Sequence, residues 1–201
     1  MELLDRWREG DREAGNELFQ RHFDSINRFF ENKVPDEVDE LVQATFFALT
    51  KHRDQFRKQS SFRTYLFTIA RNELYRHLRT RYKQDVDFGA SSLLDLATSP
   101  TGRMAKHERK HRLVDALRSL PVEQQLLIEL HYWEGIGFED LASMFEVART
   151  TIRTRLFRAR KLLRAQMEGE RALEHDASEA DEQLEAWVQG LAPYGTVGQS
   201  S

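Results

Sequence analysis

The 201-residue chain contains no cysteine, and only ten glycines and four prolines. Without cysteine it can form neither disulfide bonds nor thiolate metal sites. It has no apolar run of the roughly 18 residues that a membrane span requires, and its first residues, MELLDRWREGD, lack the apolar stretch of a secretory signal. Strand-like alternation of apolar and polar residues is also missing. These absences predict an all-α protein in the cytoplasm, without membrane insertion.

The most informative stretch that is present runs from Gly137 to Arg164. Apolar residues recur there at helical spacing in two segments separated by a tight turn, which predicts a helix-turn-helix. The two apolar faces consist of Phe138, Leu141, Ala142 and Phe145, and of Ile152, Leu156, Ala159 and Leu163. The second helix carries seven Lys/Arg and no acid between residues 149 and 164. Such a helix suits the DNA major groove, although a solvated basic face would have the same composition.

A formal net charge of −3 is unfavourable for nucleic-acid binding, but the charges are unevenly distributed along the chain. Residues 1–50 carry six basic and twelve acidic side chains, whereas residues 51–83 carry ten basic and two acidic ones. Residues 168–201 carry one basic and eight acidic side chains. The basic segments 51–83 and 149–164 therefore lie between acidic ones, and the overall charge says little about partners.

The pattern along the chain predicts two small helical domains joined by a flexible linker, with the helix-turn-helix in the C-terminal one. Residues 84–105 are rich in Ser, Thr, Gly and Pro and show no helical period, which marks a boundary. We expect Asp36 to be the N-cap of the helix that follows Pro35. The expected helices span about 12–33, 36–52, 62–83, 106–120 and 121–133. The expected divisions are an N-terminal domain 1–84, a linker 85–108, a C-terminal domain 109–167 and an acidic extension 168–201.

Aromatic and basic residues alternate within segment 56–83. Unpaired bases stack on aromatic rings while Lys and Arg hold the backbone, so the composition suits single-stranded or opening DNA. The alternative is that the rings belong to the core. We assign Phe62, Leu66, Phe67, Ile69 and Leu74 to the core on their spacing. The residues expected to be exposed are Tyr65, Tyr75 and Arg76.

Three motifs together resemble those of a bacterial sigma factor of the extracytoplasmic-function group. They are DELVQATFFAL (Asp39–Leu49), SSFRTYLFTIARNELYRHLR (Ser60–Arg79) and the helix-turn-helix segment, in the family's order. The resemblance covers about residues 3–83 and 110–166. It implies a protein that binds core RNA polymerase, directs it to promoters and helps to melt DNA, and that needs no cofactor, metal or catalytic residue. An anti-sigma factor is left open as a further partner.

The resemblance also assigns residues to three sites. Those matching the helix that docks on core polymerase are Asp39, Glu40, Leu41, Val42, Gln43 and Phe46. Those matching the part that reads and opens the minus-ten element are Phe62, Arg63, Tyr65, Ala70, Arg71, Asn72, Tyr75 and Arg76. Those matching the helix that reads the minus-thirty-five element are Arg149, Thr150, Thr151, Arg153, Thr154, Phe157 and Arg158, to which helix geometry adds Lys161.

Helix geometry divides the last group further. At about 100° per residue, the residues expected to approach base edges are Thr150, Arg153, Thr154 and Phe157. The residues expected to hold phosphates are Arg155, Arg158, Arg160 and Lys161. The turn departs from the family pattern, because Glu146 stands where glycine is usual, Ala148 where proline is usual and Thr150 where glycine is common.

The acidic extension and the overall function leave alternatives open. The extension could cover a basic surface of the protein itself, form a docking peptide or be a poorly ordered remnant. A two-domain transcriptional regulator would share the helix-turn-helix without joining core polymerase. An enzyme is disfavoured, because Asp36, Glu37, Asp39 and Glu40 cannot converge on one metal and the pair His107 and His111 lacks the glutamate of an HExxH motif. A pure interaction module would not explain two basic segments.

Overall fold

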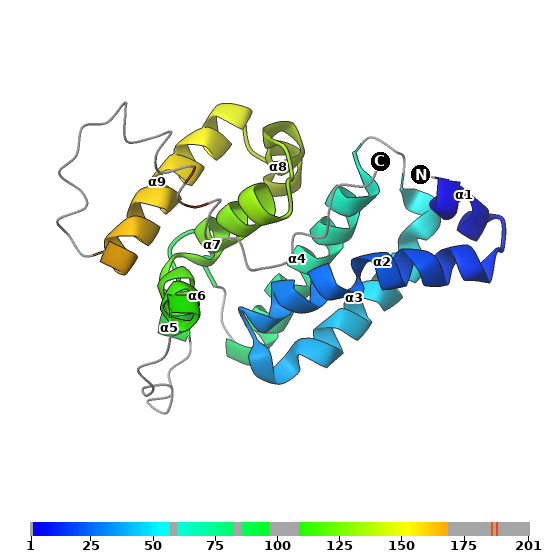
Figure 1. The fold of residues 1–201 in the computed structure, drawn as a ribbon, viewed down its shortest axis with the longest axis horizontal. Coiled ribbons are helices and arrows are strands. Elements are labelled where there is room, and N and C mark those ends of the chain that lie inside the picture. The colour runs from blue at the N-terminus through cyan, green and yellow to red at the C-terminus, as the bar shows by residue number, and fades with distance from the viewer. Residues whose placement is uncertain are drawn as a thin grey trace. The chain divides into compact units, whose positions relative to one another are not determined.

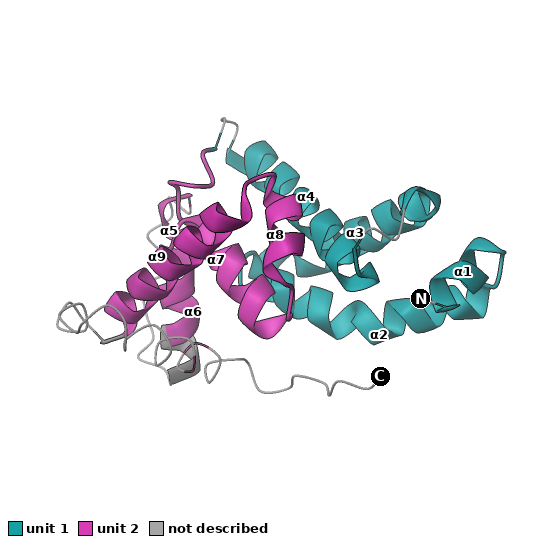
Figure 2. Cartoon of the chain, turned by 90° about the horizontal axis from the view of Figure 1, so that it is seen from above, with its two compact units in different colours: residues 1–86 teal, residues 87–201 magenta. Residues whose placement is uncertain are grey.

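The computed structural model describes residues 2–56, 60–82, 86–96 and 109–168, together with Ala186 and Val188. These residues form helices and turns, and none of them belongs to a strand (Figure 1). The chain divides into two compact units, residues 1–86 and 87–201 (Figure 2). The expected all-α, two-domain fold is therefore confirmed. Within the described ranges, no helix has the length and apolarity needed to cross a bilayer.

The N-terminal unit is a bundle in which consecutive helices pack on one another. Its elements are α1 (Glu2–Arg8), α2 (Arg12–Glu31), the 3-10 turn η1 (Pro35–Glu37), α3 (Val38–His52), the 3-10 turn η2 (Arg53–Gln55) and α4 (Phe62–Tyr82). The start of α2 is fixed by the Asp11 carboxylate, which accepts hydrogen bonds from the amides of Glu13 and Ala14 at 3.0 and 3.1 Å. The start of α4 is fixed by the Ser61 hydroxyl, which accepts from the Thr64 amide at 3.0 Å.

Aromatic and aliphatic side chains of α2 and α4 fill the core of this unit. Phe30, Leu66, Phe67 and Leu74 have no exposed surface. The Phe29 ring lies edge-on to Phe30 and Phe67, with ring centres 5.1 and 5.6 Å apart. The predicted core positions Leu66, Phe67 and Leu74 are confirmed.

Two local predictions for this unit are wrong. Ile69 is half-buried rather than part of the core. Asp36 caps no helix, because it lies inside η1 and α3 begins only at Val38. The reason is Pro35, whose fixed backbone angle starts a 3-10 turn that runs directly into α3.

The described part of the C-terminal unit is built around the long helix at residues 149–168. Its elements are α5 (Leu93–Leu96), α6 (Arg109–Ser119), α7 (Val122–Ile128), the π-helical turn η4 (Glu129–Trp133), α8 (Phe138–Phe145) and α9 (Arg149–Glu168). Helix α9 packs on α6, α7 and α8. Ile152, Leu156, Ala159 and Leu163 have no exposed surface, so the predicted apolar face of α9 is confirmed.

Part of the expected linker belongs to this C-terminal unit. The absence of helix expected over 84–105 is wrong at α5, where Leu93 and Leu96 are buried. The Ser92 hydroxyl accepts from the Asp95 amide at 3.1 Å, and the Asp95 carboxylate accepts from the Ser92 amide at 3.2 Å. This reciprocal capping starts the short helix, and the Ser92 hydrogen bonds lower the pKa of Asp95. Residues 97–108 and the extension 168–201, apart from Glu168, Ala186 and Val188, lie outside the described residues.

Candidate nucleic-acid interface

The turn between α8 and α9 has the geometry of a helix-turn-helix despite its unusual sequence. Glu146 takes the left-handed conformation, with φ 56° and ψ 40°. The Glu146 amide donates to the Ser143 carbonyl at 3.3 Å, and the Val147 amide donates to the Ala142 carbonyl at 3.0 Å. These hydrogen bonds end α8 with a left-handed residue, in the pattern that usually has glycine at this position. The side chain at Glu146 adds a steric cost of about 1 kcal/mol, which the packing of α8 on α9 tolerates.

The outward face of α9 carries the residues predicted to read DNA. Because the opposite face is buried, the helix presents a continuous surface in which none of the eight predicted residues is buried. The exposed members are Arg149, Thr150, Arg153, Thr154 and Arg158, and the half-buried ones are Thr151, Phe157 and Lys161. The Lys161 ammonium lies 4.6 Å from the centre of the Phe157 ring.

Two residues at the start of α8 orient arginines of this face. The Arg149 guanidinium forms an ion pair with Glu139 at 2.9 Å. The Arg153 guanidinium lies 5.4 Å from the centre of the Phe138 ring, which in turn lies 4.5 Å from the His131 ring. Phe138 was expected only in the apolar face of the first helix, and Glu139 was not predicted to contact this surface. Both side chains restrain arginines on the outward face of α9.

Two of the four residues expected to hold phosphates have polar partners on other helices of the unit. Arg160 is only 4% exposed and donates to the Tyr132 hydroxyl at 2.5 Å, so its expected role is wrong. Arg155 is half-buried and forms an ion pair with Glu123 of α7 at 2.7 Å. The charge pattern of α9 could not reveal these partners, because they lie about 30 residues away in the chain.

A second candidate surface lies along α4. Asn72 and Arg76 are exposed, whereas Phe62, Arg63, Tyr65, Arg71 and Tyr75 are half-buried and Ala70 is buried. The expected exposure of Arg76 is therefore confirmed, and that of Tyr75 is wrong. The Arg71 guanidinium donates to the Asn72 side-chain oxygen at 2.9 Å and lies 5.5 Å from the centre of the Tyr75 ring. Arg76 pairs with Glu73. Four of the expected residues, Arg71, Asn72, Tyr75 and Arg76, thus lie close together on α4, whereas Arg63 lies nearer the start of the helix.

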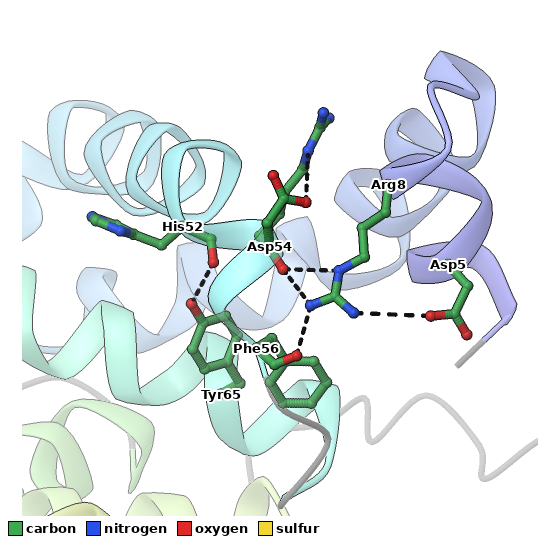
Figure 3. A network of polar contacts seen from close by, with 7 residues as sticks. Asp5, Arg8, His52, Asp54, Phe56 and Tyr65 are labelled. Atoms are coloured by element: carbon green, nitrogen blue, oxygen red, sulfur yellow. Dashed lines mark hydrogen bonds and ion pairs between the residues drawn. The ribbon is translucent and has the colours of Figure 1, made fainter.

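Tyr65 is more buried, and Phe62 less buried, than their spacing in the sequence predicted. The expected exposure of Tyr65 is wrong, because its hydroxyl donates to the His52 carbonyl at 3.0 Å and its ring lies 4.8 Å from Phe56 (Figure 3). Burial raises the pKa of this tyrosine. The Phe62 ring, expected in the core, is half-buried and lies edge-on to Phe56 at 6.4 Å.

The helix expected to dock on polymerase, α3, presents acidic and amide side chains to solvent. Asp39, Glu40 and Gln43 are exposed. Leu41 and Val42 are only 4% and 5% exposed, so they form the core beneath this surface rather than the surface itself. An open acidic cavity of about 520 Å³ lies at the start of α3. The acids that line it are Glu31, Asp36, Glu37, Asp39 and Glu40.

Phe47 is the residue of α3 that the sequence analysis missed. Its side chain is 71% exposed, whereas the predicted Phe46 is half-buried against Phe19 and Phe23. Phe23 on α2 is itself 45% exposed. An exposed aromatic side chain on a helix surface is typical of a protein interface. Helix periodicity alone does not separate the adjacent Phe46 and Phe47, since two successive helical residues, such as Leu41 and Val42, can both be buried.

No group of three His, Asp or Glu side chains in the described ranges is arranged to hold a metal ion. His107 and His111 are not tested as metal ligands, since His107 and the side chain of His111 lie outside those ranges.

Two family models match the chain in the order of the two units. The model of Sigma-70 region 2 matches residues 18–84, and that of Sigma-70, region 4 matches residues 110–163. The ECF RNA polymerase sigma-E factor of Escherichia coli strain K12 is 28% identical over 172 residues, or 80% of this chain and 90% of that protein. The corresponding factor of Haemophilus influenzae is 26% identical over 80% of this chain and 91% of its own length.

Two solved structures share the fold. One is the sigma factor RpoE in complex with the anti-sigma factor NepR from Bartonella quintana, with 24% identity and a TM-score of 0.61 over 77% of this chain and 97% of that one. The other is CnrH in complex with the cytosolic domain of CnrY, with 24% identity and a TM-score of 0.61 over 84% of this chain and 96% of that one.

Proposed function

This chain belongs to the sigma-70 family, in its extracytoplasmic-function group, and on that premise we propose how its surfaces divide the work of a promoter-specific transcription initiation factor. The observation that carries the proposal is the pair of separate surfaces, on α9 and α4, in the two units that match regions 4 and 2. The protein acts with RNA polymerase in the cytoplasm as a regulator rather than an enzyme.

The outward face of α9 reads the minus-thirty-five element as closed duplex. A helix with short polar residues at its N-terminal end and arginines around them fits the major groove. Arg153 and Thr154 contact base edges, while Arg158 and Lys161 contact phosphates. The ion pair of Arg149 with Glu139 is exchanged for a phosphate contact on binding.

The α4 surface holds the opened minus-ten element. Its aromatic rings and arginines are suited to stacking on unpaired bases and to binding the backbone of a single strand. Arg71, Asn72 and Arg76 provide the exposed polar contacts, and Tyr75 provides a partly exposed ring.

The surface of α3 docks on core polymerase. Phe47 is the apolar anchor, and the exposed acids Asp39 and Glu40 face a basic partner. Because the two structural neighbours were solved with bound partners, one of them an anti-sigma factor, we also propose that an anti-sigma factor regulates this chain by competing for these surfaces.

Run-off transcription with added core polymerase on a genomic promoter library tests the function. We expect transcripts from a small set of promoters that share both elements. A two-domain regulator of the helix-turn-helix class would instead bind DNA without joining core polymerase. Failure to co-purify with core, together with unchanged transcription, would therefore contradict the proposal.

The docking surface predicts the behaviour of Phe47→Ala. Removing a well-exposed aromatic anchor should weaken binding to core polymerase by about 2 kcal/mol, or roughly thirtyfold. Binding of the isolated chain to minus-thirty-five duplex should be unchanged. Fluorescence titration with core polymerase measures the effect, and Asn16→Ala, at an exposed position of α2, is the control. Equal affinities of the two variants for core would place the docking surface elsewhere.

A further inference from the structure

Helix α1 lies outside the matched region-2 model, which begins at residue 18, yet it is tied to the end of the α3–η2 segment by Arg8. The Arg8 Nε and one terminal nitrogen donate to the Arg53 carbonyl at 3.0 and 2.6 Å. The same terminal nitrogen donates to the Phe56 carbonyl at 2.6 Å. In Figure 3 the Arg8 guanidinium points at the Phe56 carbonyl and has Asp5 on its other edge, with 3.9 Å between the Arg8 nitrogen and the Asp5 oxygen.

These bonds lie at the ends of two consecutive elements, because Arg53 is the C-cap of α3 and Phe56 is the C-cap of η2. Carbonyls at a helix C-terminus carry the negative end of its dipole, which favours a cation there. A guanidinium suits them because its planar fork reaches two acceptors at once and keeps its charge. The Arg53 side chain adds a second link to α1, since its guanidinium lies 5.2 Å from the centre of the Trp7 ring.

Phe56 contacts two aromatic residues at the start of α4. The Phe56 side chain is 5% exposed, and its ring lies 4.8 Å from Tyr65 and 6.4 Å from Phe62. The Tyr65 hydroxyl binds the His52 carbonyl in the same segment. Arg8 therefore fixes the backbone that places Phe56 against Tyr65 and Phe62, two residues assigned to the minus-ten element.

We propose that Arg8 is a positioning residue for promoter opening, acting through Phe56 on Phe62 and Tyr65. This inference rests on the proposed function. The core at Phe30, Phe67 and Leu74 is supplied by α2 and α4, so loss of the Arg8 fork leaves that packing in place. Arg8 thus affects the opening step and not the recognition of closed duplex by α9.

The test uses the full chain with core polymerase on a promoter obtained from the run-off experiment. A 2-aminopurine base in the minus-ten element reports opening, and gel shift at low temperature reports the closed complex. For Arg8→Ala we expect opening at least fivefold slower, with closed-complex affinity within twofold of wild type. Arg8→Lys should resemble Arg8→Ala, because an ammonium is a point charge without the planar fork. Arg6→Ala removes the same charge from an exposed position of α1, where Arg6 pairs with Asp11, and should leave both measurements unchanged.

A template with a mismatched, already open minus-ten element separates positioning from misfolding. On it, Arg8→Ala should transcribe within twofold of wild type. Opening of the duplex promoter at the wild-type rate would overturn the proposal, and so would equal losses on the two templates. Failure of the wild-type chain to open any promoter would instead contradict the proposed function, before any variant is compared.

Discussion

At the scale of single residues, His22 is held neutral by its surroundings in the N-terminal unit. It lies on α2 with only 9% of its surface exposed, and its ring is 5.3 Å from Phe62. Burial, together with the positive charges of Arg63 and Arg21, lowers its pKa from 6.5 to about 4. Protonation therefore favours the unfolded chain, in which this penalty is absent.

The pKa of His22 predicts a loss of stability in acid. The stabilisation is complete above pH 6.5 and is lost as the pH falls toward 4, since the folded-state pKa is the lower one. Between pH 7.5 and 5 the loss should be about 2 kcal/mol. Hydrogen exchange of the α2 amides at both pH values measures it. In His22→Gln this pH-dependent loss should disappear, and an undiminished loss in the variant would show that other groups cause it.

At the scale of elements, α1 packs on α2 through a contact that only glycine permits. A Cβ added to Gly15 would lie 2.6 Å from two atoms of the Trp7 ring. Trp7 is 6% exposed and lies edge-on to Phe19 at 5.3 Å. The close approach of ring to backbone sets the position of α1, and therefore of Arg8 at its end.

The same contact predicts the effect of Gly15→Ala. A helix interior normally gains stability from alanine, but here the methyl group would push Trp7 away and overpack the interface. We expect a net loss of about 1–3 kcal/mol in the unfolding free energy of the N-terminal unit. Urea unfolding followed by exchange of the α1 and α2 amides measures it. Gly137→Ala, where the added Cβ has no neighbour within 4 Å, is the matched control. Unchanged or increased stability of Gly15→Ala would contradict the assigned contact.

At the scale of the whole molecule, opposite charges are separated between surfaces. The acids concentrate on α3 and around the cavity at its start, while α4 and α9 carry the basic residues. A formal net charge of −3 is therefore compatible with DNA binding, because counterions are released locally, where Lys and Arg meet phosphates. The acidic surface in turn favours a basic protein partner.

Two substitutions on α9 separate base reading from phosphate binding. Arg153→Ala should reduce the free energy of binding to the preferred promoter by about 1–3 kcal/mol and relax the choice of base at one position. Lys161→Ala should weaken binding to all minus-thirty-five sequences alike. It should also reduce the slope of log affinity against log salt concentration by about one. A panel of minus-thirty-five variants, titrated at several salt concentrations, measures both effects. The reverse pattern would exchange the two assignments.

The sequence by itself determined most of the helices, the apolar face of α9 and the family. The repeat of 3.6 residues is local, so the expected helices 12–33 and 62–83 differ from α2 and α4 only at their last residues, and Ile152, Leu156 and Leu163 are buried as predicted. The joint occurrence of the two motif regions identified the family, and the family models match both.

Only the tertiary structure decided which charged and aromatic side chains are available to a partner. Arg160 and Arg158 look alike in the sequence, but Arg160 is buried against Tyr132. Likewise, Phe47 rather than Phe46 is exposed, because Phe19 and Phe23 cover Phe46. These outcomes depend on residues about 20 to 30 positions away in the chain, which helix periodicity does not report. A local pattern fixes the direction of a side chain on its helix, and only packing fixes what that side chain meets.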